Sequence, residues 1–268
     1  MFLWDNVGET RIRFDGADAA GTGLAAWLDA CTVPIAMHDH ARAGILGTAT
    51  LLACGGRHVL LTAAHLFERA TSSGNWLIPE RASGHLLSLE GTQVRVIQGS
   101  DMALIDLTRA AARLHLLRGR AAIPAFLALR LWPAVRSRRH HATAGIATYC
   151  VAGYPAAWSR FERGYLAAKR LTITTTSTSS RTAKSSTERQ PEDSMGELHC
   201  RYGRIAERSD GQFIHTPALE GMSGAAIWEV TRGNGAATLH LAGVQTAFMH
   251  SRYLRGAAAG SCEPFLRR

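Results

Sequence analysis

Three short segments carry residue types that together could activate a serine. Thr62-Ala63-Ala64-His65 places a histidine after an apolar run, and Asp101 precedes another apolar run. Ser223 lies in Gly221-Met222-Ser223-Gly224, again just before an apolar run. A serine hydroxyl is a poor nucleophile until a neighbouring imidazole accepts its proton, and a carboxylate can fix the tautomer of that imidazole. The three residues therefore indicate nucleophilic catalysis by a serine with a histidine–aspartate pair.

The glycines around Ser223 suit the same chemistry. An oxyanion that develops during acyl transfer needs preorganised N–H donors, and the backbone of Gly221 and Ser223 can supply two. Glycine at position 221 also lets the backbone approach a substrate and adopt conformations that a Cβ would forbid. Asp106 is an alternative acid five residues after Asp101. It would lie further into the strand, so Asp101 is preferred.

The segments that must position these residues have a β pattern. Short apolar or β-branched runs separated by glycine-containing turns predict six strands in the first half of the chain, at 33–37, 48–54, 58–62, 76–78, 94–97 and 102–107. The pattern resumes after an Ala/Leu/Arg-rich stretch, with further strands predicted at 146–152, 165–173, 197–205, 212–215, 225–230 and 238–244. Many short strands of this kind predict antiparallel barrels or sandwiches.

Two segments differ from this pattern. Residues 110–142 have apolar residues at helical spacing and include the basic cluster Arg136 to His141, which predicts a connector with one helix. Thr174 to Glu188 is mostly Ser and Thr, with Ala183 as its one apolar residue. Such a segment buries too little apolar surface to offset its ordering entropy, so we expect a mobile surface loop.

The three segments, in the chain order His, Asp, Ser, resemble those of the chymotrypsin-like (trypsin-like) serine peptidases over roughly residues 33–250. The resemblance implies an all-β fold of two antiparallel six-stranded β-barrels with the active site in the cleft between them. It assigns His65 as general base, Asp101 as orienting acid and Ser223 as nucleophile. It also assigns the backbone N–H groups of Gly221 and Ser223 as the oxyanion hole.

The same resemblance implies a substrate-binding region. Thr246, Ala247 and Phe248 fall where the family pairs with an extended substrate backbone, a general way of holding a peptide. Pro217, with Thr216 and Ala218 beside it, falls at the base of the pocket for the side chain preceding the cut, and Glu220 at its rim. Without an aspartate at that base, and with the ring of Phe248 narrowing the entrance, we expect small or medium apolar side chains to be preferred.

The departures from the family pattern are specific. The usual Gly-x-Ser-Gly-Gly ends in Ala225, and Leu66 replaces the cysteine that follows the histidine in secreted animal members. Met222 stands where zymogen-activated members carry an aspartate. The chain therefore resembles the compact bacterial branch, whose members need no N-terminal cleavage.

Composition narrows the classes of partner and compartment. The chain has 268 residues, 46% of them hydrophobic and 19% charged, which is ordinary for a globular protein with a sizeable core. No apolar run approaches the roughly 20 residues of a membrane span. The start of the chain lacks the features of a secretory signal, and the five cysteines form no CxxC pair, so we expect a cytoplasmic protein. No metal or organic cofactor is expected.

The sequence thus predicts a serine endopeptidase that acts on protein or peptide substrates, with a regulatory partner protein left open. The alternative is a catalytically silent scaffold of the same fold that binds a peptide, or a nucleic acid through the Arg-rich connector, since the formal net charge is +9. The expected organisation is an N-terminal extension at 1–30, a first barrel at 31–109, a basic connector at 110–142, a second barrel at 143–255 with its loop at 174–188, and a C-terminal tail at 256–268.

Overall fold

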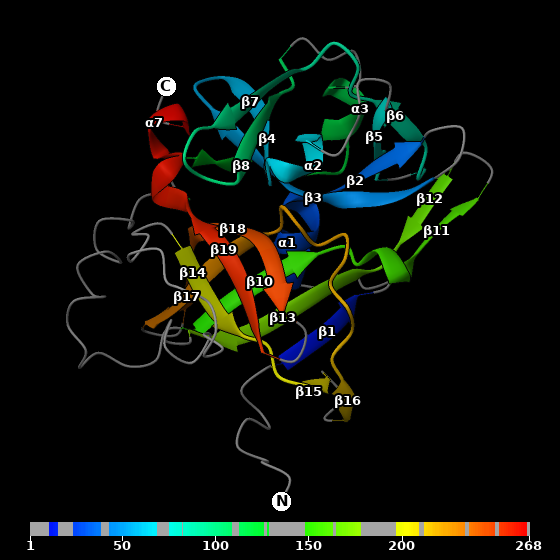
Figure 1. The fold of residues 1–268 in the computed structure, drawn as a ribbon. Helices are drawn as coiled ribbons and strands as arrows, with labels where there is room; N and C mark the ends of the chain where they lie inside the picture. Colours follow the sequence, from blue (N-terminus) through cyan, green and yellow to red (C-terminus); the bar gives the residue numbers. More distant parts are fainter. Residues whose placement is uncertain are drawn as a thin grey trace, which may run out of the picture.

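Two curled, mainly antiparallel β-sheets make up most of the part of the chain that the structure describes (Figure 1). The computed structural model describes residues 11–15, 24–38, 43–68, 75–81, 83–108, 113–125, 128, 148–162, 165–177, 197–208, 212–233, 236–249 and 252–266. No helix in these ranges is long and apolar enough to cross a membrane.

The first sheet contains the two strands next to His65 and Asp101, since His65 follows β4 and Asp101 precedes β8. Its strands follow the spatial order β6-β5-β2-β3-β4-β8-β7, and β9 pairs in parallel with β3. Their bounds are β2 (Thr32–His38), β3 (Ala43–Cys54), β4 (Arg57–Thr62), β5 (Asn75–Pro79), β6 (Leu86–Ser88), β7 (Gln93–Ile97), β8 (Met102–Asp106) and β9 (Ile123–Pro124). Side chains alternate between faces along these strands, so Leu51 and Leu60 pack in one buried cluster whereas Leu52 and Leu61 pack in another.

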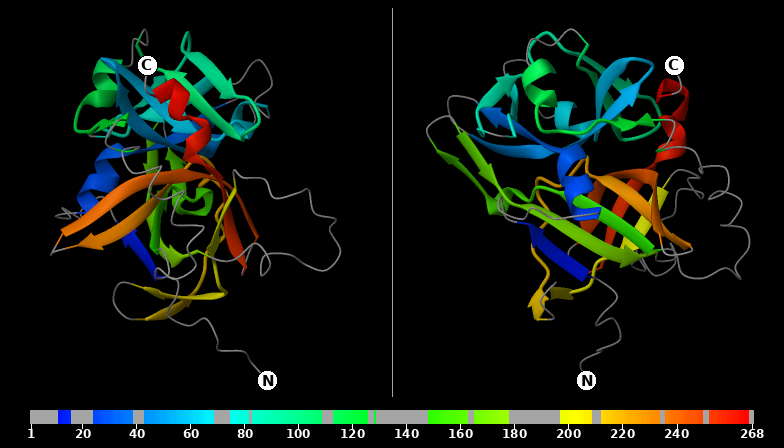
Figure 2. Two further views of the ribbon diagram at one scale, coloured as in Figure 1. Left: turned by 90° about the vertical axis from the view of Figure 1, so that its left-hand side faces the viewer. Right: turned by 180° about the vertical axis from the view of Figure 1, so that it is seen from behind.

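The second sheet includes the strand that directly follows the turn with Ser223. Its order is β14-β19-β18-β17-β10-β13-β1-β15-β16. The strands are β1 (Arg11–Asp15), β10 (Thr148–Gly153), β13 (Arg170–Thr176), β14 (Glu197–Arg201), β15 (Ile205–Arg208), β16 (Phe213–His215), β17 (Ala226–Gly233), β18 (Ala236–Met249) and β19 (Tyr253–Ala258). A separate hairpin of β11 (Ser159–Glu162) and β12 (Tyr165–Ala168) extends from this sheet toward the first one (Figures 1 and 2).

The helices of the described part are short. They are α1 (Leu24–Cys31), α2 (His65–Glu68), α3 (Arg113–Leu117), α7 (Glu263–Leu266) and the 3-10 turns η1 (Ala156–Trp158) and η2 (Ala259–Ser261). The prediction of an all-β, two-barrel fold is therefore confirmed. The strand counts differ from six and six, because eight strands form the first sheet and nine the second. Several of the additional segments, such as β6 and β9, are too short to show an alternating sequence pattern.

Two predicted boundaries, those of the N-terminal extension and of the Ser/Thr-rich loop, differ from the structure. Residues 1–30 were expected to precede the main fold, but β1 pairs antiparallel with β13 and parallel with β15, and Leu28 of α1 is fully buried. The loop expected from Thr174 begins later, because β13 continues to Thr176 in register with β10 and Ser177 bridges to Cys200. The expected basic connector contains α3 and β9. Its cluster Arg136 to His141 lies outside the described residues, and so do residues 178–188 of the expected loop.

The expected C-terminal tail is also part of the fold. Its first three residues close β19, and the segment then turns through η2 into α7, which lies beside β7 and β8 of the first sheet (Figure 1). Cys262 and Leu266 join a buried cluster that includes Leu61 of the first sheet and Trp228 of the second. The C-terminal segment thus packs apolar side chains against both barrels.

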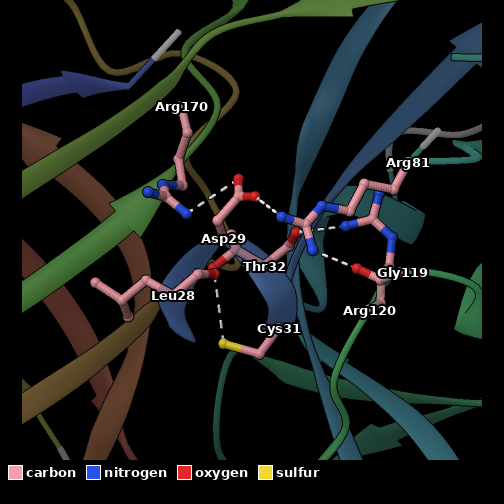
Figure 3. A network of polar contacts seen from close by, with 8 residues as sticks. All are labelled: Leu28, Asp29, Cys31, Thr32, Arg81, Gly119, Arg120 and Arg170. Atoms are coloured by element: carbon pink, nitrogen blue, oxygen red, sulfur yellow. Dashed lines mark hydrogen bonds and ion pairs between the residues drawn. The ribbon is translucent and has the colours of Figure 1, made fainter. Parts of the chain in front are cut away.

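A polar network joins the same two sheets through α1 (Figure 3). The Asp29 carboxylate contacts Arg81, which follows β5, and lies 3.1 Å from the guanidinium of Arg170 on β13. The side chain of Arg170 is only 2% exposed, so its charge needs this carboxylate close by. Arg120 donates to the carbonyl oxygens of Thr32 (2.9 Å) and Pro79 (3.1 Å).

Candidate active site

His65 and Asp101 lie in direct contact at one end of the first sheet. β4 pairs antiparallel with β8, with Thr62 opposite Ala103, so the residues that follow β4 meet the residues that precede β8. The Nδ1 atom of His65 is 2.7 Å from an Asp101 carboxylate oxygen, and the backbone N–H of His65 donates to the other oxygen at 2.9 Å. The carboxylate therefore fixes both the ring and the backbone of the histidine.

The environment of Asp101 favours its ionised form. Burial alone would raise the pKa of this carboxyl group, but hydrogen bonds from the side chain and backbone of His65 outweigh it and hold the pKa below its ordinary value. An ionised carboxylate at Nδ1 places the N–H of the neutral imidazole on that nitrogen. The opposite ring nitrogen, Nε2, is then the one able to accept a proton.

Asp106, the alternative acid, lies at the far end of β8. It is in register with Val59 of β4, and its carboxylate accepts a hydrogen bond from the N–H of Thr108 at 2.8 Å. The guanidinium of Arg57 is 3.8 Å away. Among the described residues, the carboxylate in contact with His65 is that of Asp101.

Ser223 lies in a tight turn that precedes β17. The N–H of Met222 donates to the carbonyl of Leu219 and the N–H of Ala225 to that of Met222, each at 2.9 Å. Gly221 and Gly224 have φ angles of +89° and +94°, a region that side chains with a Cβ rarely adopt. The two glycines on either side of Met222-Ser223 thus allow the turn to form.

Residues of the first sheet hold this turn in place. Thr48 of β3 donates its backbone N–H to the carbonyl of Ser223 at 2.8 Å. A Cβ added at Gly224 would lie only 2.0 Å from the Thr48 carbonyl oxygen and 3.0 Å from the backbone nitrogen of Ala63. One added at Gly47 would lie 2.8 Å from the Ser223 carbonyl oxygen and 2.3 Å from the Leu66 side chain. The backbone of the serine turn therefore packs against the segment that carries His65.

Two N–H groups of the turn have no acceptor in the described part of the chain. Among the described residues, the N–H groups of Gly221 and Ser223 donate no hydrogen bond. The carbonyls of the same two peptides are engaged, because Glu220 accepts from Ala156 at 2.6 Å and Met222 accepts from Ala225. In a trans peptide the N–H points away from the C=O, so both donors point away from the interactions that hold the turn.

The residues expected around the substrate pocket precede the serine turn. Thr216 is buried, and its hydroxyl donates to the carbonyl of Gly203 at 2.8 Å. The phenol of Tyr202 donates to the carbonyl of Pro217. Ala218 and Glu220 are exposed. The structure thus anchors Thr216 and Pro217 by hydrogen bonds and leaves the Glu220 side chain at the surface.

The other expected substrate residues, Thr246, Ala247 and Phe248, lie on the last part of β18. That part pairs with β19, with Ala247 opposite Arg255 and Phe248 opposite Leu254, after a bulge that follows Gln245. The pairing with β17 on the other side ends with Ala226 opposite Val244. In the described part of the chain, no strand pairs with the remaining edge of 246–248.

Sequence reasoning missed Thr48, although this residue hydrogen-bonds to the carbonyl groups of both Gly221 and Ser223 in the serine turn. Its hydroxyl donates to the carbonyl of Gly221 at 2.9 Å and accepts from the N–H of Tyr154 at 3.0 Å. A threonine within a β-rich segment is ordinary, so the sequence contains no signal that would single it out.

Comparison with known proteins identifies solved structures of the same fold. No protein-family model and no curated protein sequence matches the chain. A solved thermostable serine protease, AL20, from an extremophilic microorganism superposes with a TM-score of 0.51 and 13% identity, over 90% of this chain and 97% of that one. The fold is chymotrypsin-like.

A second solved structure shares this architecture. It comes from a study of how aromatic interactions drive the coupled folding and binding of the intrinsically disordered Sesbania mosaic virus VPg protein. Its TM-score is 0.50 at 14% identity, with 96% of each chain covered. At 13% and 14% sequence identity, these two structural similarities show the fold and do not show the activity.

Proposed function

We propose that the protein is a serine endopeptidase that hydrolyses peptide bonds through an acyl-enzyme. His65 accepts the proton of the Ser223 hydroxyl as the serine oxygen attacks the substrate carbonyl. The tetrahedral intermediate collapses when the imidazolium of His65 protonates the departing amine. A water molecule, activated by the same histidine, then attacks the ester and releases the acid half.

The observation that carries the proposal is the pair of unengaged N–H groups on the serine turn, beside the segment of His65 and Asp101. Backbone donors at Gly221 and Ser223 are fixed before the reaction begins, because the carbonyls of their own peptides are already hydrogen-bonded. Preorganised donors of this kind stabilise an oxyanion without reorganisation, and one of them contributes roughly 2.7–4 kcal/mol in the transition state. A turn with only a structural role has no need to leave both donors open.

The end of β18 supports a peptide as the substrate. The edge of Thr246 to Phe248 that faces away from β19 has no strand partner in the described part of the chain. An extended peptide can add to such an edge through main-chain hydrogen bonds. For the side chain that precedes the cut, we propose small or medium apolar residues, because Glu220 is exposed and Pro217 carries no charge.

The alternative function is a silent scaffold that binds a peptide without cleaving it. The neighbour from the VPg study is compatible with a binding role for a chain of this fold. The two functions differ in one observable, since only the enzyme turns substrate over.

Cleavage of a peptide library by the purified full-length chain tests the proposal. We expect cleavage products from the wild-type chain, with Ala, Val or Leu preferred before the cut, and none from Ser223→Ala. Ser100→Ala is the matched control, because Ser100 directly precedes Asp101 and, among the described residues, its hydroxyl bonds only to the carbonyl of Ile97, at 3.4 Å. A library that stays intact, with peptides retained equally by wild type and Ser223→Ala, would support the scaffold instead.

A further inference from the structure

We propose that Thr48 is a positioning residue of the active site, which sets the direction of the oxyanion-stabilising N–H groups from the opposite barrel. The inference rests on the proposed function, because it assigns Thr48 a part in the same reaction. Thr48 lies on β3 of the first sheet, whereas the serine turn precedes β17 of the second. It is fully buried, so it acts through the turn and does not touch the substrate.

All the polar groups of Thr48 are used at this junction. The backbone N–H donates to the carbonyl of Ser223 at 2.8 Å, and the hydroxyl donates to the carbonyl of Gly221 at 2.9 Å. The hydroxyl also accepts from the N–H of Tyr154 at 3.0 Å. The backbone carbonyl accepts from the hydroxyl of Thr62 at 2.7 Å.

These contacts fix the peptides on either side of the Ser223 N–H. The carbonyl of Gly221 belongs to the peptide that precedes Met222, and the carbonyl of Ser223 belongs to the peptide that follows the serine. With both held by Thr48, and with the carbonyl of Met222 held by Ala225, three successive peptide planes are fixed. The direction of the Ser223 N–H follows from them, because each peptide is planar.

The role of the hydroxyl is directional. It accepts one hydrogen bond from Tyr154, so its own hydrogen is free to point at the carbonyl of Gly221. Loss of the hydroxyl would leave that carbonyl and the Tyr154 N–H unpaired. The Gly221–Met222 peptide would then be held on one side only, by the hydrogen bond from the Met222 N–H to the Leu219 carbonyl. Serine can make both hydrogen bonds, whereas valine has the shape of threonine and can make neither.

The test compares Thr48→Val, Thr48→Ser and Thr50→Val in peptide hydrolysis. Thr50 is a matched control, because it lies two residues further along β3, is also buried, and its hydroxyl has no partner among the described residues. We expect Thr48→Val to lower kcat about tenfold to a hundredfold, as a misplacement of about 1 Å can, with KM changed less than about threefold. We expect Thr48→Ser to retain most of kcat and Thr50→Val to match wild type.

A second readout separates positioning from a general loss of structure. A peptide aldehyde forms a tetrahedral oxyanion adduct with an active serine, so its affinity reports on the oxyanion donors. We expect Thr48→Val to bind the aldehyde less tightly by the same factor as its loss of kcat, while thermal unfolding confirms a folded chain. If Thr48→Val does not fold, Thr48→Ala is measured in the same way.

The outcomes distinguish the two proposals. If the wild-type chain hydrolyses peptides and Thr48→Val or Thr48→Ala keeps wild-type kcat and aldehyde affinity, the role of Thr48 is wrong and the proposed function stands. A fall in kcat that Thr48→Ser does not rescue, or that Thr50→Val shares, also overturns the role of the hydroxyl. If the wild-type chain hydrolyses nothing, the proposed function fails and the role of Thr48 fails with it.

Discussion

At the scale of single residues, the proposed activity depends on which atoms are fixed before a substrate arrives. Asp101 orients His65 through two hydrogen bonds, and the Ser223 turn is held by Thr48. Each arrangement removes a conformational choice that the reaction would otherwise have to make, which is how positioning lowers a barrier. The same arrangements predict effects on stability that can be measured without a substrate.

The ionisation of Asp101 couples folding to pH. Its pKa is lower in the folded chain than in the unfolded one, so the stabilisation is present above the unfolded pKa of about 3.9 and is lost as the pH falls through the folded pKa. We therefore expect the free energy of unfolding of Asp101→Asn to fall less steeply with decreasing pH than that of the wild-type chain. Urea unfolding of both chains between pH 6 and about pH 3 measures this, and parallel curves would contradict it.

Gly224 combines a positive φ with close backbone contacts. Replacement by alanine would place a Cβ 2.0 Å from the Thr48 carbonyl oxygen and 2.1 Å from the Thr62 hydroxyl. We expect Gly224→Ala to lower the free energy of unfolding by more than about 3 kcal/mol. Gly91→Ala is the control, since Gly91 has a φ of +75° with open space around it, and it should lose only about 1–2 kcal/mol. Equal losses in the two variants would contradict the packing argument.

At the scale of elements, α1 connects the two sheets through the carboxylate of Asp29. The Arg170 side chain on β13 is almost fully buried, so removal of the Asp29 carboxylate takes away one of the groups that compensate its buried charge. We expect Asp29→Asn to lower the free energy of unfolding by about 1–3 kcal/mol, less than for a fully buried pair because Asp29 is 35% exposed.

Glu197→Gln is the comparison for this effect. Glu197 is 4.0 Å from Arg255 in a pair whose side chains are 42% and 45% exposed, and such pairs contribute at most about 1 kcal/mol. Chemical denaturation of both variants measures the difference. A smaller effect for Asp29→Asn than for Glu197→Gln would show that the network does not hold the sheets together.

The elements also show what a sequence can and cannot indicate. Apolar runs and glycine turns predicted strands such as β4 and β8, because a buried strand must be apolar. Residues 11–15 and Thr174 to Thr176 were not predicted as strands, since neither segment has an apolar run of its own. Their strands form through pairing with each other and with neighbours, and such long-range pairing leaves little trace in a local pattern.

The candidate site also has residues that the sequence indicates and contacts that only the structure shows. His65, Asp101 and Ser223 stand out in the sequence because their residue types and neighbours are unusual for strands. The structure adds the contact between the first two and the turn that holds the third. The contribution of Thr48 depends on two carbonyl groups more than 170 residues away in the chain, and only the fold brings them together.

At the scale of the whole molecule, none of the five cysteines forms a disulfide, and all five are buried. Burial raises the pKa of Cys31 and Cys262 to about 12 and that of Cys54 to about 11, so almost none of these three thiols is ionised near neutral pH. We expect none of the five thiols to react with Ellman's reagent in the folded chain at pH 8, and all five to react in guanidinium chloride. Rapid reaction of a thiol in the folded chain would contradict this burial.

The proposed activity requires that His65 and Asp101 activate Ser223 in the folded chain. Intact-mass spectrometry after treatment with an aryl fluorophosphonate measures this directly, because the probe phosphonylates only an activated serine. We predict one probe per chain, mapped to Ser223 by peptide sequencing, no label on Ser223→Ala, and labelling at least about a hundredfold slower in His65→Gln. Absence of label on the folded wild-type chain, or labelling that is as fast in His65→Gln, would contradict the account.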